Sequence, residues 1–163
     1  MTKVENGITL SKNDLGNKGK GSYVLLIELP EAETIAIGSL KAVHFRRGHY
    51  AYIGSAMGGF KSRLNHHLRV NKKPRWHIDY LLAKASINGI VICPTQGRVE
   101  CPIAQALSHH FDAIPHFGSS DCQCSSHLFF ATDDQPMKRW VVSITRLITA
   151  ESRQLTRRRR KEE

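Results

Sequence analysis

The run from Tyr23 to Leu29 is apolar at six of its seven positions and is bounded by Gly21 and Pro30. A short apolar run between turn-forming residues is typical of a strand buried in a core. A buried strand needs a domain around it, and the 163 residues of this chain are enough for one. A domain of this size buries roughly 70% of the surface that its unfolded chain exposes, so a substantial core can form around this strand.

Further strand patterns alternate with helical patterns along the chain. Apolar runs predict strands at residues 34–37, 49–53, 90–93 and 128–131. Apolar residues spaced three or four apart predict helices at residues 60–68, 78–85, 102–111 and 137–148. This alternation predicts a small α+β domain in which helices flank a short central β-sheet.

Composition divides the chain into four parts. Residues 1–20 are rich in Asn, Gly, Ser and Lys and are predicted to form a flexible leader. Residues 21–131 form the predicted domain, and residues 132–155 contain the predicted amphipathic C-terminal helix. Residues 156–163 carry a run of five basic residues, which predicts a disordered tail for solubility or non-specific anchoring.

Several classes of protein are excluded or disfavoured by composition. No stretch approaches the ~18 consecutive apolar residues of a membrane span, so no membrane partner is expected. The polar N-terminus has no apolar segment typical of a secretory signal. Four cysteines are too few for a disulfide scaffold in a chain of this length. Reduced thiols and a cytoplasmic location are therefore expected.

The formal net charge of +10 is concentrated between residues 41 and 75, where nine basic residues occur without an acidic one. Four histidines and four aromatic residues are interspersed among them. Basic and aromatic side chains together favour contact with phosphates and stacking on bases, so a nucleic acid is the predicted partner. A solvated basic face is the alternative. The candidate contacts are Arg46, Arg47, Lys61, Arg69, Lys72, Lys73 and Arg75.

Two short motifs that pair a tyrosine with a glycine fall on consecutive long apolar strands. The first is Gly21-Ser22-Tyr23 and the second is Tyr52-Ile53-Gly54. Arg63 follows on the next predicted helix, and Glu100 precedes a later one. Over residues 21–131 this arrangement resembles the GIY-YIG nuclease superfamily, whose signature is Gly-x-Tyr, Tyr-x-Gly, an Arg on the following helix and a metal-binding Glu.

Four longer segments resemble an uncharacterised branch of that superfamily, a domain of unknown function. They are residues 21–25, 52–56, 76–82 and 118–128, the last reading Gly-Ser-Ser-Asp-Cys-Gln-Cys-Ser-Ser-His-Leu. Because all four occur in the same order over about 110 residues, they indicate membership of the branch more firmly than they indicate an activity.

The resemblance implies an endonuclease that hydrolyses phosphodiester bonds in DNA rather than RNA, during repair or DNA processing. It assigns Glu100 to a Mg²⁺ or Mn²⁺ ion and Arg63 to the scissile phosphate, where its planar fork suits two phosphate oxygens. Tyr52 would be the general base, supported by Tyr23, and His67 is a candidate proton shuttle or phosphate contact. A phenol has a reference pKa of about 10, so the role of Tyr52 requires positive charge nearby, which the basic block is expected to supply.

Two alternatives to an active nuclease remain open. Several active relatives have a Lys directly after the second motif, whereas this chain has Ser55. The lost cation favours a nucleic-acid-binding module that kept the fold without cleavage. A zinc-stabilised domain that binds a partner through residues 137–148 is a third possibility. If the resemblance is set aside, Tyr52 is interpreted as a core aromatic, as strand tyrosines usually are, and Arg63 as a solvated helical arginine.

Cys122, Cys124 and His127 lie within six residues of one another, and Cys101 could complete a Cys₃His zinc site. The Cys-x-Cys spacing is tighter than in common zinc sites, so ordinary packing of the thiols is an alternative. A redox or nucleophilic role for the pair Cys122 and Cys124 is a further alternative. The interpretation favoured over these is a loop that positions Asp121 and His127 beside the active face.

Overall fold

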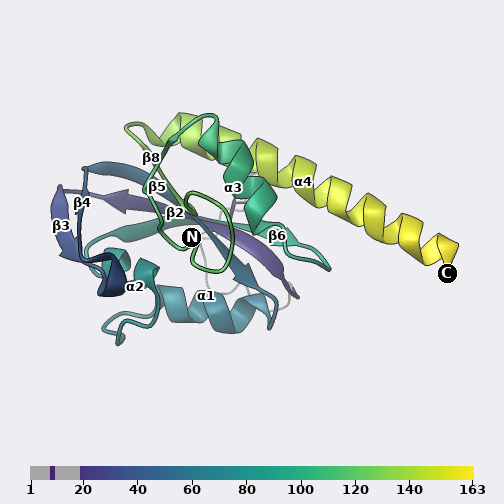
Figure 1. The fold of residues 1–163 in the computed structure, drawn as a ribbon, viewed down its shortest axis with the longest axis horizontal. Coiled ribbons are helices and arrows are strands. Elements are labelled where there is room, and N and C mark those ends of the chain that lie inside the picture. The colour runs from purple at the N-terminus through teal and green to yellow at the C-terminus, as the bar shows by residue number, and fades with distance from the viewer. Residues whose placement is uncertain (1–7, 10–18) are drawn as a thin grey trace.

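The computed structural model describes residues 8–9 and 19–163, so most of the predicted leader lies outside the described residues. A six-stranded antiparallel sheet forms the centre of the fold, in the order β1-β6-β2-β5-β8-β7 (Figure 1). The strands are β1 (Ile8–Thr9), β2 (Gly21–Leu29), β5 (Gly48–Ala56), β6 (Ser86–Pro94), β7 (Asp112–Ala113) and β8 (Leu128–Ala131). Two further strands, β3 (Glu33–Ala36) and β4 (Ala42–Phe45), form a separate hairpin around the 3-10 turn η2 (Gly38–Leu40).

Helices cover both faces of the sheet. In Figure 1, α1 (Phe60–Leu68) and α2 (His77–Leu82) lie below it, and α3 (Glu100–Ser108) and α4 (Asp134–Glu162) lie above it. Strand β2 explains this layering, because alternate side chains of a strand point to opposite faces. Leu25 and Ile27 join the core beneath α1 and α2, whereas Val24 and Leu26 join the core beneath α3 and α4.

The predicted α+β class is confirmed, with differences in detail. The strand expected at 128–131 is found with those bounds, and the helix expected from Phe60 onwards is found as Phe60–Leu68. Strands β1, β4 and β7 were not predicted, because β1 and β7 have two residues each and β4 carries only a partial alternation. Among the described residues, no helix is both long enough and apolar enough to cross a membrane.

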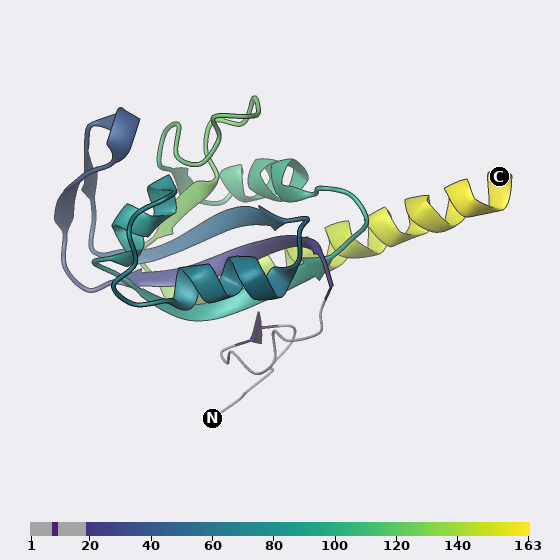
Figure 2. The same cartoon turned by 90° about the horizontal axis from the view of Figure 1, so that it is seen from below.

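The C-terminal basic run differs from its prediction. It is the end of α4, which continues without a break to Glu162 and projects beyond the sheet (Figure 2). Residues 153–161 contain neither proline nor glycine, and arginine is a good helix former. The basic side chains of the last turn also interact favourably with the negative end of the helix dipole. The tail is therefore a helical extension rather than a disordered segment.

Candidate functional site

A cavity of about 610 Å³ opens where β5 meets α1, α3 and the loop before β8. Three residues predicted from the sequence line it from three separate elements: Tyr52 from β5, Arg63 from α1 and Glu100 from α3. Tyr23 and His67 are not part of the lining and lie buried beneath it. The full lining is Tyr52, Gly54, Ser55, Met57, Gly58, Arg63, Trp76, Arg98, Glu100, Cys101, Gly118, Asp121, Cys122 and His127.

Tyr23 and the second motif are locked together by contact. The Tyr23 ring lies directly over Gly54, its partner across β2 and β5, so a side chain at position 54 would collide with the ring. The Tyr23 hydroxyl and the His67 Nε2 are hydrogen-bonded at 2.5 Å. The glycine of the motif is therefore explained by space, and Tyr23 supports the cavity floor from within the core.

His67 lies inside the core, although the sequence predicts it as a proton shuttle or phosphate contact. It is only 3% exposed, and burial lowers its pKa to about 3, a shift that the Asp79 carboxylate opposes. The imidazole is therefore neutral, and its Nδ1 has no hydrogen-bond partner among the described residues. Buried against Tyr23, the ring does not reach phosphate or solvent. Its hydrogen bond orients the Tyr23 hydroxyl, and the role of proton shuttle stays a prediction.

The lowered pKa of His67 predicts that the folded protein loses stability in acid. An unfolded histidine has a pKa of about 6.5, so below that pH the unfolded chain binds a proton that the folded chain excludes. The contribution of His67 to stability is present above pH 6.5 and is lost as pH falls towards 3, at up to ~1.4 kcal/mol per pH unit. Urea unfolding at several pH values should give a flatter profile for His67→Gln. The exposed His109→Gln serves as control, and equal slopes for all three proteins would contradict this assignment.

Tyr52 does not have the electrostatic surroundings that the sequence predicted. Burial raises the pKa of its hydroxyl to about 12. The Arg63 guanidinium lowers this pKa, while the carboxylates of Asp79, Asp121 and Glu100 raise it further. The basic block therefore does not activate the phenol as expected, because burial and the three carboxylates outweigh the lowering of this pKa by Arg63.

Arg63 is held by stacking. Its guanidinium carbon lies 4.3 Å from the centre of the Trp76 ring, a cation–π contact that leaves the edge of the fork free for hydrogen bonds. Trp76 in turn is fixed by the buried Asp79, whose Oδ2 accepts hydrogen bonds from the backbone N–H groups of Arg75 (2.8 Å) and Trp76 (3.0 Å). His66 Nε2 lies 3.0 Å from the same oxygen. These hydrogen bonds keep the pKa of Asp79 below its usual value although burial raises it.

Glu100 is the first residue of α3 and is 9% exposed. Its Oε2 accepts a hydrogen bond of 2.8 Å from the Ser22 hydroxyl, which itself accepts one from the Val99 N–H at 3.1 Å. The helix N-terminus also favours a carboxylate at this place. Ser22 is thus the residue of the first motif that positions Glu100, a role not predicted from the sequence because 78 positions separate the two.

The predicted Cys₃His cluster comes together in space. The ligand atoms of Cys101, Cys122, Cys124 and His127 all lie within 4.8 Å of one another, so the cluster could hold a metal ion. Cys122 Sγ is 3.4 Å from His127 Nε2, and Cys101 Sγ is 4.0 Å from it. Burial, together with the neighbouring thiols of Cys124 and Cys122, raises the pKa of Cys101 to about 12. Cys101, Cys122 and His127 also line the cavity, which joins the cluster to the candidate site.

The predicted basic contacts divide into three groups. Arg46 and Arg47 precede β5, and the six strand residues 48–53, seven steps of ~3.3 Å or roughly 23 Å, separate Arg47 from Gly54. Arg46 is also paired with Asp112 at 3.1 Å. Lys72 donates hydrogen bonds to the carbonyls of His66 and His67 and so caps α1. The remaining four, Lys61, Arg69, Lys73 and Arg75, are exposed on and after α1.

Two lining residues, Trp76 and Arg98, were not predicted as site residues. Trp76 belongs to a segment singled out by the resemblance, and Arg98 lies in the loop before Glu100. Arg98 gave no sequence signal, because an isolated basic residue in a loop is usually solvated. The structure adds both to the cavity beside Arg63 and Glu100.

The fold and the cavity define a class: an α+β protein with a phenol, an arginine and a carboxylate in one cleft, beside a Cys₃His cluster. A family model described as "Domain of unknown function DUF123" matches residues 22–150, and the chain belongs to this family. Neither the search of curated proteins nor that of solved structures found a match.

Proposed function

We propose that this protein is a Mg²⁺-dependent endonuclease of the GIY-YIG type that hydrolyses phosphodiester bonds in DNA. The observation that carries the proposal is the meeting of Tyr52, Arg63 and Glu100 in one cavity. These three residues come from β5, α1 and α3, and the sequence resemblance assigns them to one reaction.

The carboxylate of Glu100 fits a hard divalent cation. Ser22 occupies only its Oε2, and its Oε1 accepts no hydrogen bond from the described residues. Mg²⁺ is often held by one or two carboxylates, with water and substrate phosphate completing its shell. When bound, the ion would neutralise charge that develops on the phosphate. Manganese would suit the same oxygen donors.

The remaining roles fall to side chains of the cavity. Arg63, stacked on Trp76, presents its fork to two oxygens of the scissile phosphate. Tyr52 orients the attacking water and accepts its proton when it is the phenolate, a form that Arg63 favours by lowering the pKa of this phenol. Arg98 adds a second cation to the cleft, partly replacing the lysine that is absent at Ser55.

A nucleic-acid-binding module without cleavage is the second candidate. It is favoured by the pKa of Tyr52, raised to about 12, and by Ser55 in place of a basic residue. In that case the cavity would hold a phosphate through Arg63 and Arg98 without activating a water.

We further propose that the Cys₃His cluster binds structural Zn²⁺. Ligand atoms of a tetrahedral zinc site with sulfur ligands lie roughly 3.8 Å apart, given Zn–S bonds of about 2.3 Å. The separations of up to 4.8 Å in the cluster are close to this value and need only small shifts of side chains. Zinc would tie the first turn of α3 at Cys101 to the loop that carries Cys122, Cys124 and His127.

A cleavage assay with a matched pair of variants tests the nuclease proposal. Arg63→Ala should lower the rate of DNA nicking in Mg²⁺ by about 100-fold or more, because removing a group that stabilises the transition state costs roughly 3–4 kcal/mol. The control is Lys61→Ala, which removes an exposed charge from the same helix and should change the rate by no more than a few fold. Equal loss in both variants would show a general charge effect and contradict the role of Arg63.

A further inference from the structure

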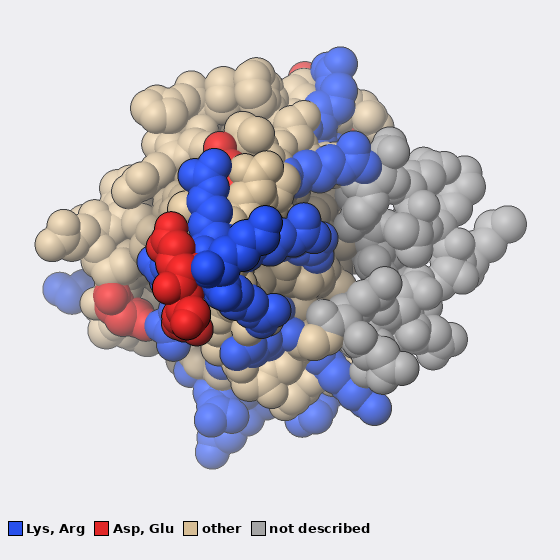
Figure 3. Space-filling model, turned by 90° about the vertical axis from the view of Figure 1, so that its right-hand side faces the viewer, with Lys and Arg blue, Asp and Glu red and all other residues tan. Residues whose placement is uncertain are grey.

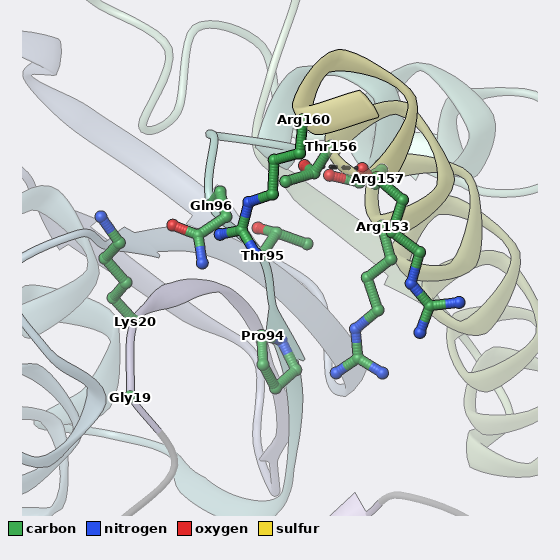
Figure 4. Close-up of a pocket in the computed structure, with 10 residues that line it drawn as sticks. Gly19, Lys20, Pro94, Thr95, Gln96, Arg153, Thr156, Arg157 and Arg160 are labelled. Carbon is green, nitrogen blue, oxygen red and sulfur yellow. Dashed lines mark hydrogen bonds between the residues drawn. The ribbon is translucent and has the colours of Figure 1, made fainter. Parts of the chain in front are cut away.

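A second hollow, about 400 Å³ in volume, lies between the C-terminal half of α4 and the adjacent ends of β2 and β6. Arg153, Arg157 and Arg160 line it from α4, and in Figure 4 Arg160 reaches toward Gln96 while Lys20 lies on the opposite side. Its floor consists of Pro94, the last residue of β6, and of Thr95 and Gln96, which follow that strand. We call this hollow the α4 groove.

The arginines of the α4 groove share one face of the helix. Positions 153, 157 and 160 follow the i, i+4, i+7 spacing that aligns side chains along a helix. They span roughly 10 Å along the axis, at 1.5 Å per residue. All three are exposed, as is Lys20, and no ion pair joins any of the four to an acidic residue among those described.

The surface around the groove is strongly basic. Figure 3 looks onto the end of the molecule towards which α4 projects, and blue Lys and Arg side chains gather there. Red acidic side chains also appear on this face, and the acidic residues of this part of α4 are Glu151, Glu162 and Glu163. None of the three lines the groove, which therefore presents four cations and no carboxylate.

We propose that the α4 groove binds the phosphate backbone of a nucleic acid strand, beside the cavity of Tyr52, Arg63 and Glu100. A row of cations about 10 Å long faces roughly three successive phosphates of one strand, which rise ~3.4 Å each. A single phosphate would use only one or two of these arginines, so the length of the row favours a polymer. The choice of a nucleic acid as that polymer rests on the proposed function.

The loop between β6 and α3 joins the α4 groove to the cavity. Thr95 and Gln96 form the groove floor, Arg98 lines the cavity, and Glu100 follows two residues later. Gln96 and Arg98 also line a third hollow that lies between them, against Arg159 of α4. That hollow also contains Glu151 and apolar side chains, so the two cations Arg98 and Arg159 mark the path from the groove to the candidate site.

Binding of fluorescein-labelled DNA, followed by anisotropy across a range of KCl concentrations, tests this inference. The probes are single-stranded and duplex oligonucleotides, and EDTA is present so that no cleavage occurs. The variant combines Arg153→Gln, Arg157→Gln and Arg160→Gln. Its control combines Arg139→Gln, Arg146→Gln and Arg158→Gln, which remove the same charge from exposed positions of α4 outside the groove.

We expect the groove variant to bind DNA at least 10-fold more weakly in 100 mM KCl. The slope of log affinity against log salt should fall by about 2–3, since each lost phosphate contact removes ~0.9. The control should stay within about threefold of the wild type. Equal losses in both variants, an unchanged groove variant, or preferential binding of the wild type to anionic lipid vesicles would overturn the proposal. Because EDTA stops cleavage, groove binding can succeed or fail independently of nuclease activity.

Discussion

Replacing Glu100 with Gln is expected to reduce Mg²⁺-dependent DNA cleavage at least ~100-fold while leaving DNA binding in EDTA nearly unchanged. The substitution keeps the size of the side chain and an oxygen that can still accept the hydrogen bond from Ser22. It removes the negative charge, which is the property that a hard divalent cation requires. Loss of cleavage without loss of folding would therefore assign the effect to the metal site.

Two further variants make the Glu100 test specific. Ser22→Ala removes the hydrogen bond that fixes the carboxylate, and it should cost roughly 10-fold in rate and raise the Mg²⁺ concentration needed for half-maximal cleavage. Glu31→Gln neutralises an exposed carboxylate that does not line the cavity and should behave like the wild type. If Glu100→Gln cleaves within a few fold of the wild-type rate, Glu100 does not hold the ion.

The second large effect concerns zinc. The protein purified without chelators should contain one zinc ion per chain, and chelation should lower its melting temperature by roughly 10 °C. A ligand present at 1,000 times its Kd stabilises by ~4 kcal/mol, and 1 kcal/mol shifts Tm by about 2–4 °C for a chain of this size. Cys122→Ser should lose the zinc and melt at the lower temperature with or without chelator.

Cys93 provides the matched control for this test. It is a free thiol buried in the core beneath α3 and α4, outside the Cys₃His cluster. Cys93→Ala should therefore lose some stability through packing but retain its full zinc content. Zinc-free wild-type protein from metal-replete cells, or zinc retained in Cys122→Ser, would contradict the assignment. Mass spectrometry under native conditions measures the metal directly.

Much of the fold could be predicted because the local patterns are strong. The apolar run of β2 and the four-residue spacing of Phe60, Leu64 and Leu68 each have one simple interpretation, and the structure confirms both. Residues 157–161 were harder, since a basic run is compatible with disorder or with helix. These residues are helical because they continue the amphipathic part of α4.

The site shows where sequence patterns lose information. His67 and Arg63 share one helical row, yet His67 is buried because the Tyr23 ring approaches α1 from β2. Lys72 counts as one more positive charge in the sequence, but it caps α1. Contacts between distant segments determine both the burial of His67 and the capping of α1 by Lys72. Such contacts also bring the acidic groups close to Tyr52. No local pattern encodes such contacts.

The most direct test of the account is nicking of supercoiled, branched and single-stranded DNA by the wild-type protein, with Mg²⁺ or Mn²⁺ added and with EDTA. The protein should carry its zinc, so that the wall of the cavity is intact. We predict metal-dependent cleavage of at least one of these substrates that is abolished by EDTA and restored by excess Mg²⁺. Absence of cleavage on every substrate, with DNA binding retained, would contradict the nuclease and leave a binding module.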